Sequence, residues 1–114
     1  MKDQLYLLKP DFFDNQNGPF FCPECALIEG MLSFYPGLRN NIDVHYVDFI
    51  RPRQILITIL GEANQSLPKL IIAQSSRVTP IKSNVETFNG KNFISNPLEI
   101  CKYLAFTYGV GMPH

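Results

Sequence analysis

The chain has 114 residues, with ten basic and ten acidic side chains and 46% hydrophobic residues. This length suits one domain with its own core, so we predict a single domain over residues 1–114. Balanced charge without a basic block argues against a nucleic-acid partner. The opening apolar run, Leu5 to Leu8, is too short for a secretory segment or a membrane span. We therefore expect a cytoplasmic protein with no membrane partner.

The apolar pattern predicts strands and helices that alternate through the first half of the chain. Proline marks both helix starts, and glycine marks both helix ends. The predicted elements are a strand over residues 5–9, a phenylalanine-rich loop over 11–21, a helix from Pro23 to Pro36-Gly37, a strand over 42–50, and a helix from Pro52 to Gly61. Because helices connect these strands, we expect parallel pairing with right-handed crossovers.

The second half predicts one buried strand, a hairpin and a last helix. The elements are a strand over residues 69–73, a polar loop over 74–84, strands over 85–88 and 91–94 joined by the turn Asn89-Gly90, and a helix from Asn96-Pro97 to Tyr108-Gly109. The order is thus β-α-β-α-β-β-α. We predict an α/β fold whose mixed four- to five-stranded sheet carries helices on both faces.

Two of the three cysteines form the motif Cys22-Pro23-Glu24-Cys25, between the first strand and the first helix. The unpaired N–H groups and positive dipole of a helix start favour a thiolate there. A thiolate with a second thiol one turn along allows reversible disulfide chemistry. The Glu24 carboxylate raises the pKa of Cys22 by less than the helix start lowers it. We predict that Cys22 is more exposed and more acidic than Cys25.

The strand and helix order around this motif resembles the thioredoxin superfamily, over most of the chain. Cys22-Pro23-Glu24-Cys25 is similar to the glutaredoxin motif, in which proline follows the first cysteine. Ser66-Leu67-Pro68 before residues 69–72 resembles the superfamily's proline before the third strand. The segment from Phe93 to Gly109 resembles the end of the glutathione-transferase N-terminal domain. The segments LLKPDFFD and CALIEG are similar to a small group of bacterial thioredoxin-like proteins.

The resemblance implies a thioredoxin-like fold and a thiol–disulfide oxidoreductase of the glutaredoxin type. Its catalytic residues would be Cys22, which attacks a disulfide, and Cys25, which resolves the mixed disulfide. It also implies that Pro68 is cis and lies against the cysteines. The residues that we predict to bind substrate are Leu67, Pro68, Pro23 and Arg53. The partner would be a protein or a low-molecular-weight thiol or disulfide, and no cofactor is predicted.

Several positions differ from the glutathione-dependent relatives. Asn96 and Pro97 stand where glutathione transferases carry an acidic residue and a serine, so glutathione binding is not predicted. Glu24 replaces the aromatic residue usual in glutaredoxins. The helical second domain of glutathione transferases is not expected, because the chain stops at His114.

Other interpretations of the same residues stay open. The cysteine pair could serve a binding or redox-sensing module without turnover, or could simply be buried in a core. A zinc site could draw on Cys22, Cys25, Cys101, His45 and His114, but no second closely spaced ligand pair exists, so no metal is predicted.

Three further features outside the motif have more than one interpretation or a structural one. Cys101 lies on the apolar stripe of the last helix, which favours core packing. Arg51-Pro52-Arg53 reads either as a solvated basic turn or as a site for a substrate carboxylate. The loop phenylalanines form either a lid over the site or a small second core.

Overall fold

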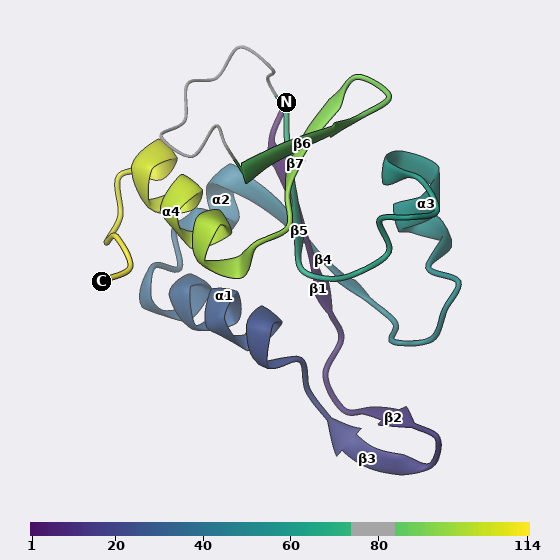
Figure 1. Cartoon of the computed structure of the whole chain (residues 1–114). Coiled ribbons are helices and arrows are strands. Elements are labelled where there is room, and N and C mark those ends of the chain that lie inside the picture. The colour runs from purple at the N-terminus through teal and green to yellow at the C-terminus, as the bar shows by residue number, and fades with distance from the viewer. Residues whose placement is uncertain (74–83) are drawn as a thin grey trace.

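The computed structural model describes residues 1–73 and 84–114, which form a mixed α/β fold (Figure 1). Its elements are β1 (Asp3–Leu8), β2 (Phe12–Asp14), β3 (Asn17–Phe20), α1 (Pro23–Phe34), α2 (Leu38–Asn41), β4 (Ile42–Val47), α3 (Gln54–Leu60), β5 (Lys69–Ile72), β6 (Val85–Phe88), β7 (Lys91–Ile94) and α4 (Pro97–Tyr108). Except for Asn84, the polar loop predicted over residues 74–84 lies outside the described residues. The short helix α2 was not predicted.

The main sheet has five strands in the order β4-β1-β5-β7-β6. β1 pairs in parallel with β4, whereas β5 is antiparallel to both β1 and β7. The hairpin of β6 and β7 turns at Asn89 and Gly90, both with positive φ, as the Asn-Gly dipeptide predicts. These pairings confirm a mixed, five-stranded sheet.

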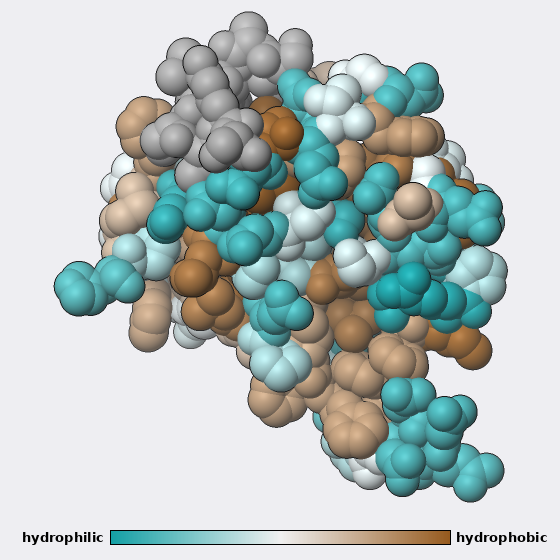
Figure 2. Space-filling model, viewed as in Figure 1, coloured by the Kyte–Doolittle hydropathy of each residue, from teal (hydrophilic) through white to brown (hydrophobic). Residues whose placement is uncertain are grey.

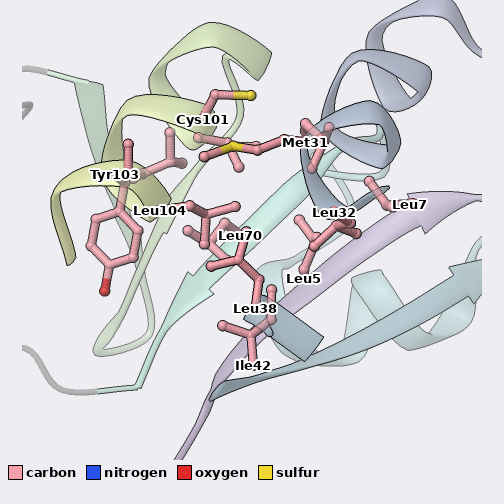
Figure 3. Close-up of a cluster of buried hydrophobic side chains, with 14 of the residues drawn as sticks. Leu5, Leu7, Met31, Leu32, Leu38, Ile42, Leu70, Cys101, Tyr103 and Leu104 are labelled. Atoms are coloured by element: carbon pink, nitrogen blue, oxygen red, sulfur yellow. The ribbon is translucent and has the colours of Figure 1, made fainter. Parts of the chain in front are cut away.

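Helices cover both faces of this sheet (Figure 1). α1, α2 and α4 pack on one face, where Ile28, Leu38 and Leu104 join Leu5 and other buried side chains in the larger core. Figure 3 shows side chains from the sheet, α1 and α4 converging in this cluster, with Cys101 among them. Cys101 is buried, which confirms the packing role predicted for it. α3 packs on the opposite face through a smaller cluster that includes Leu56 and Leu60.

A buried carboxylate fastens the start of the chain to its last helix. Asp3, at the first position of β1, is fully buried. Its Oδ2 accepts hydrogen bonds from the hydroxyls of Tyr103 and Tyr108, each at 2.7 Å. Its Oδ1 accepts from the backbone N–H of Ala73 at 2.8 Å. One side chain therefore joins β1, α4 and the end of β5.

The segment predicted as a loop over residues 11–21 contains a second, two-stranded sheet, so that prediction is wrong in its middle. β2 and β3 pair antiparallel as a hairpin that protrudes from the body beyond the end of β1 (Figures 1 and 2). Its strands are short and irregular in register, and Pro19 interrupts one of them, so no alternating pattern marks them in the sequence. Gly18 has a φ of +141°, and a Cβ there would lie 2.7 Å from the carbonyl oxygen of Phe12.

The second helix starts later than the sequence predicts. Pro52 follows a cis peptide bond, and α3 begins only at Gln54 with Arg53 as its N-cap. The strand predicted over residues 42–50 likewise ends at Val47. The helix end at Gly61 is confirmed, because its N–H donates to the carbonyl oxygen of Ile57. No helix in the described part of the chain is long and apolar enough to cross a membrane.

Candidate functional site

Cys22 is the N-cap of α1, and Pro23 occupies the first helical position. The Cys22 Sγ accepts a hydrogen bond from the backbone N–H of Cys25, with 3.2 Å between nitrogen and sulfur. This is the capping contact that serine or aspartate usually supplies at a helix start, here made by sulfur. The contact satisfies one of the free N–H groups of the first turn of α1.

Cys25 lies one turn further along α1 and is buried, whereas Cys22 is only partly buried, which confirms the predicted difference in exposure. The two residues approach to 3.0 Å without a disulfide. Burial raises the pKa of the Cys25 thiol from 9.0 to about 12, with help from its hydrogen bond to the Cys22 side chain and from the charge of Glu24. The N–H of Leu8, 3.4 Å from Cys25 Sγ, acts in the opposite direction and lowers this pKa.

A pocket of about 570 Å³ opens beside the two cysteines. This volume lies within the range of small-molecule sites in proteins, about 300 to 1,000 Å³. Leu8, Pro10 and Phe21 give it an apolar wall, and Cys22 is the more exposed of its two sulfur residues. The pair is therefore accessible from one side through a cavity rather than across a flat surface.

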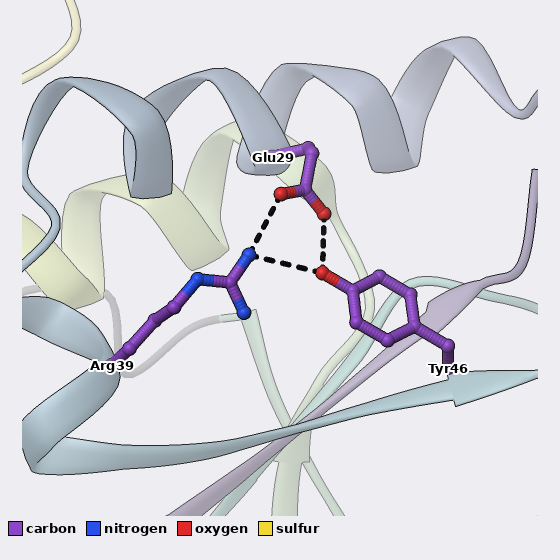
Figure 4. Close-up of polar contacts among 3 residues, drawn as sticks. All are labelled: Glu29, Arg39 and Tyr46. Atoms are coloured by element: carbon purple, nitrogen blue, oxygen red, sulfur yellow. Dashed lines mark hydrogen bonds and ion pairs between the residues drawn. The ribbon is translucent and has the colours of Figure 1, made fainter.

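The pocket also touches a polar cluster formed by Glu29, Arg39 and Tyr46 (Figure 4). The Tyr46 hydroxyl donates to Glu29 Oε1 at 2.6 Å, and Arg39 Nη2 donates to Glu29 Oε2 at 2.8 Å and to Tyr46 Oη at 3.0 Å. These contacts join α1, α2 and β4. Burial raises the pKa of Tyr46, as does its hydrogen bond to Glu29, so the hydroxyl keeps its proton.

Leu67 and Pro68 lie at the same end of the sheet as the cysteines. Their peptide bond is cis, as predicted. Tyr6 of β1 is paired with Lys69 in an antiparallel register, so the two residues before Lys69 run alongside the end of β1, where Leu8 contacts Cys25. Leu67 packs, as Cys22 does, against the larger core. Contact of Pro68 with Cys22 itself stays a prediction.

Arg53 is buried, so a solvated basic turn is the wrong description of it. Its guanidinium donates to the carbonyl oxygen of Phe49 at 2.6 and 3.1 Å and to that of Gln65 at 2.9 Å. Its backbone N–H donates to the Gln65 side chain. Burial and the nearby Arg51 lower its pKa, and the charges of Cys25 and Cys22 act in the opposite direction. Arg53 thus holds the loop that leads to Pro68. To bind a substrate carboxylate, as predicted, its guanidinium would have to give up hydrogen bonds to the carbonyl oxygens of Phe49 and Gln65.

The phenylalanines near the motif form neither a closed lid nor a second core. Phe12 alone packs inward, where its ring stacks on Phe49 with centroids 4.3 Å apart. Phe13, Phe20 and Phe21 are exposed, and Phe21 lines the pocket beside Cys22. Figure 2 shows apolar residues near the base of the protruding hairpin and hydrophilic ones at its tip. Phe21, which directly follows the hairpin, therefore adds exposed aromatic surface next to the sulfur pair.

Sequence reasoning missed Leu8, Glu29 and Tyr46 as parts of this site. The backbone N–H of Leu8 gives no signal in a sequence, because any non-proline residue supplies one. Glu29 lies one turn of α1 beyond Cys25, so helical spacing could have pointed to it. Tyr46 lies on a different strand, and only the parallel pairing of β1 with β4 brings it to the pocket. Among the described residues, no group of three or more His, Cys, Asp or Glu side chains is arranged to hold a metal ion.

The burial of the cysteines leads to a labelling prediction. At pH 8 iodoacetamide should modify Cys22 alone in the native protein. Burial raises the pKa of Cys101 to about 11 and that of Cys25 to about 12, so few thiolates form on either. Raising the pKa of Cys25 from 9.0 to about 12 lowers its thiolate fraction at pH 8 about a thousandfold. Peptide mapping after labelling should find one modified site in buffer and three in urea; a Cys25 that reacts as fast as Cys22 would contradict the assigned burial.

Fold and site together define a mixed α/β protein with a cysteine pair at a helix start, beside a pocket. The chain belongs to the DUF3088 family, whose model is described as "Protein of unknown function (DUF3088)" and matches residues 2–112. No curated protein and no solved structure matches the chain.

Proposed function

We propose that the protein is a thiol–disulfide oxidoreductase of the glutaredoxin type, with Cys22 as nucleophile and Cys25 as resolving thiol. One observation carries this proposal: the partly exposed Cys22 caps a helix, the buried Cys25 lies one turn along with the two residues 3.0 Å apart at their closest, and both line a pocket. In such an arrangement the exposed cysteine attacks the substrate as a thiolate. The buried cysteine stays protonated until it resolves the mixed disulfide.

In the first step, Cys22 Sγ attacks one sulfur of a substrate disulfide. A bond forms between Cys22 and that sulfur, the substrate S–S bond breaks, and the second half leaves as a thiolate that takes a proton from water. The Cys25 N–H and the helix start stabilise the attacking thiolate before the reaction. Substrate must approach through the pocket, because Cys25 is buried.

In the second step, Cys25 loses its proton and attacks Cys22 Sγ. The mixed disulfide breaks, the first substrate half leaves as a thiol, and a Cys22–Cys25 disulfide remains. Two protein thiols are thereby oxidised and one substrate disulfide is reduced to two thiols. The Leu8 N–H favours the thiolate form of Cys25, so it assists this step. An external thiol or dithiol would regenerate the pair.

The topology supports a thioredoxin-like relationship, which we also propose. β1 lies between a parallel neighbour reached through α1 and an antiparallel neighbour that follows a cis proline. β7, antiparallel to β5, precedes α4, as the last strand and helix do in that superfamily. The hairpin of β2 and β3 and the edge strand β6 would be additions to this plan.

A redox-sensing or binding module that uses the same pocket without turnover is the second candidate. Two observations favour it. The exposed Glu24 carboxylate is adjacent to Cys25 in the chain, where its charge, after burial, raises the pKa of the Cys25 thiol. Asn96, at the position of the glutathione ligand in related folds, is used as the N-cap of α4, where its Oδ1 accepts from the N–H of Glu99 at 3.0 Å. A cytoplasmic location and a protein or small thiol partner remain part of the proposal for both functions.

Reversible bridging tests the redox chemistry common to both candidates. The purified protein is equilibrated in dithiothreitol buffers of graded redox potential, quenched with acid, alkylated and weighed by mass spectrometry. We expect the oxidised form to carry two fewer alkyl groups than the reduced form, with a Cys22–Cys25 bridge in the peptide map, and to recover both thiols on reduction. Bridging that involves Cys101, or no bridging in any buffer, would contradict the proposal.

A further inference from the structure

The pocket beside the cysteines carries charges that are already neutralised. Lys9, which lines it, lies 3.2 Å from Asp48 as an ion pair. Glu29, which also lines it, is held by Arg39 at 2.8 Å and by the Tyr46 hydroxyl (Figure 4). The pocket is therefore electrically balanced, with each charged side chain of its lining bound to a partner of opposite charge.

Apart from these charged groups, Tyr46 and the two cysteines, the lining is apolar, and Lys9 is its one cation among the described residues. Leu7, Leu8 and Phe21 form a hydrophobic wall next to the sulfur atoms. The guanidinium of Arg53 donates its hydrogen bonds to the carbonyl oxygens of Phe49 and Gln65. A negatively charged thiol or disulfide would have to displace Asp48 from Lys9 to find a cation in this lining, whereas an uncharged apolar group replaces water on apolar surface.

We propose that the substrate of this site is a disulfide whose bound half is uncharged and apolar, such as an aromatic or aliphatic thiol group, and not an anionic thiol of the glutathione kind. The group occupies the 570 Å³ pocket, with its sulfur against Cys22 and its far end toward Tyr46. This substrate class rests on the proposed function, since it specifies what the same cysteine pair reduces.

Two disulfide probes of different charge test the preference. The reduced protein reacts in single turnovers with dithiodipyridine, which is uncharged at pH 8, and with dithiobis(nitrobenzoate), which is dianionic. Each rate is divided by the rate of mercaptoethanol with the same probe, which removes the intrinsic reactivity of the disulfide. We expect the normalised rate with the uncharged probe to be at least about tenfold higher. Equal normalised rates would overturn the proposal.

A charge variant makes the test specific to this pocket. Asp48→Asn leaves Lys9 without its partner and should raise the normalised rate with the anionic probe about two- to fivefold, the range in which exposed charge pairs act. The rate with the uncharged probe should not change. Asp43→Asn is the matched control, because Asp43 lies at the opposite end of β4, roughly 16 Å away and beyond the screening length in 0.1 M salt. Equal effects of the two variants would show bulk charge to be responsible and would contradict the proposal.

Filling the cavity tests the apolar part of the proposal. Ala26 lines the pocket on α1, so Ala26→Phe should lower the normalised rate with dithiodipyridine about tenfold or more. Ala63→Phe introduces the same side chain at an exposed turn outside the pocket and should have no effect. Circular dichroism establishes that both variants fold. An unchanged rate in folded Ala26→Phe protein would place the binding surface elsewhere.

A binding experiment separates this inference from the function on which it rests. Bipyridyl, an uncharged ring pair that lacks the disulfide, is titrated into Cys22→Ser protein while amide NMR shifts are followed. Shifts of Leu8, Ala26 and Tyr46 support the pocket assignment even if the cysteines prove not to bridge. Reversible bridging without these shifts and without probe selectivity would leave the oxidoreductase proposal intact and overturn the substrate class.

Discussion

Replacing Cys22 by serine should reduce the rate of disulfide reduction by roughly a thousandfold or more, to the background of the buffer thiol. Cys22 is the one sulfur of the pair that substrate reaches, because Cys25 is buried behind it and holds its proton to a pKa of about 12. Serine retains the capping contact to the Cys25 N–H, so α1 should still form. The measurement is turnover of a model disulfide with dithiothreitol as reductant.

Cys25→Ser should behave differently, and this difference identifies the roles. Attack by Cys22 remains possible, so the variant should accumulate a mixed disulfide visible by mass spectrometry and retain a residual rate with small thiols. Cys101→Ser is the matched control, since its sulfur lies in the core, outside this pocket. If folded Cys22→Ser protein keeps its activity, or if Cys25→Ser loses the first step as well, the assignment of nucleophile and resolving thiol is wrong.

Replacing Asp3 by alanine should destabilise the fold by about 3 kcal/mol or more. The carboxylate accepts hydrogen bonds from Tyr103, Tyr108 and Ala73, and its loss leaves these buried or partly buried donors without this acceptor. Each buried donor that loses its partner costs about 1 to 3 kcal/mol, and such costs are not simply additive. A domain of this size is stable by only about 5 to 15 kcal/mol, so the effect is a large share of the total.

Urea denaturation followed by circular dichroism measures this change. Asp3→Asn retains an acceptor oxygen and should lose less than Asp3→Ala, which separates hydrogen bonding from charge. Asp43→Ala serves as the control for removing an acidic side chain near the same strand pair, since Asp43 is exposed and accepts a hydrogen bond from the exposed Gln4 side chain. A change below about 1 kcal/mol in Asp3→Ala would show that this network does not stabilise the fold.

The local signals of the sequence determined most elements and the position of the sulfur pair. Pro23 after Cys22 fixes the helix start because proline lacks an N–H and has a helical φ, so Cys22 had to be the cap. Asn89-Gly90 fixes a hairpin because both residues accept positive φ. Asn96 with Pro97 marks the last helix in the same way. These features depend on residues within one turn of each other.

The surroundings of the cysteines were decided by the tertiary structure alone. Tyr46 meets Glu29 only because β4 pairs with β1, and Arg53 turns inward only because the carbonyl oxygens of Phe49 and Gln65 converge on it. The irregular hairpin of β2 and β3 rests on the body through the stacking of Phe12 on Phe49. Contacts between residues far apart in the chain leave no periodic pattern in it. The sequence therefore determined where the sulfur atoms lie along the fold, and packing decided which charges and which apolar wall a substrate meets there.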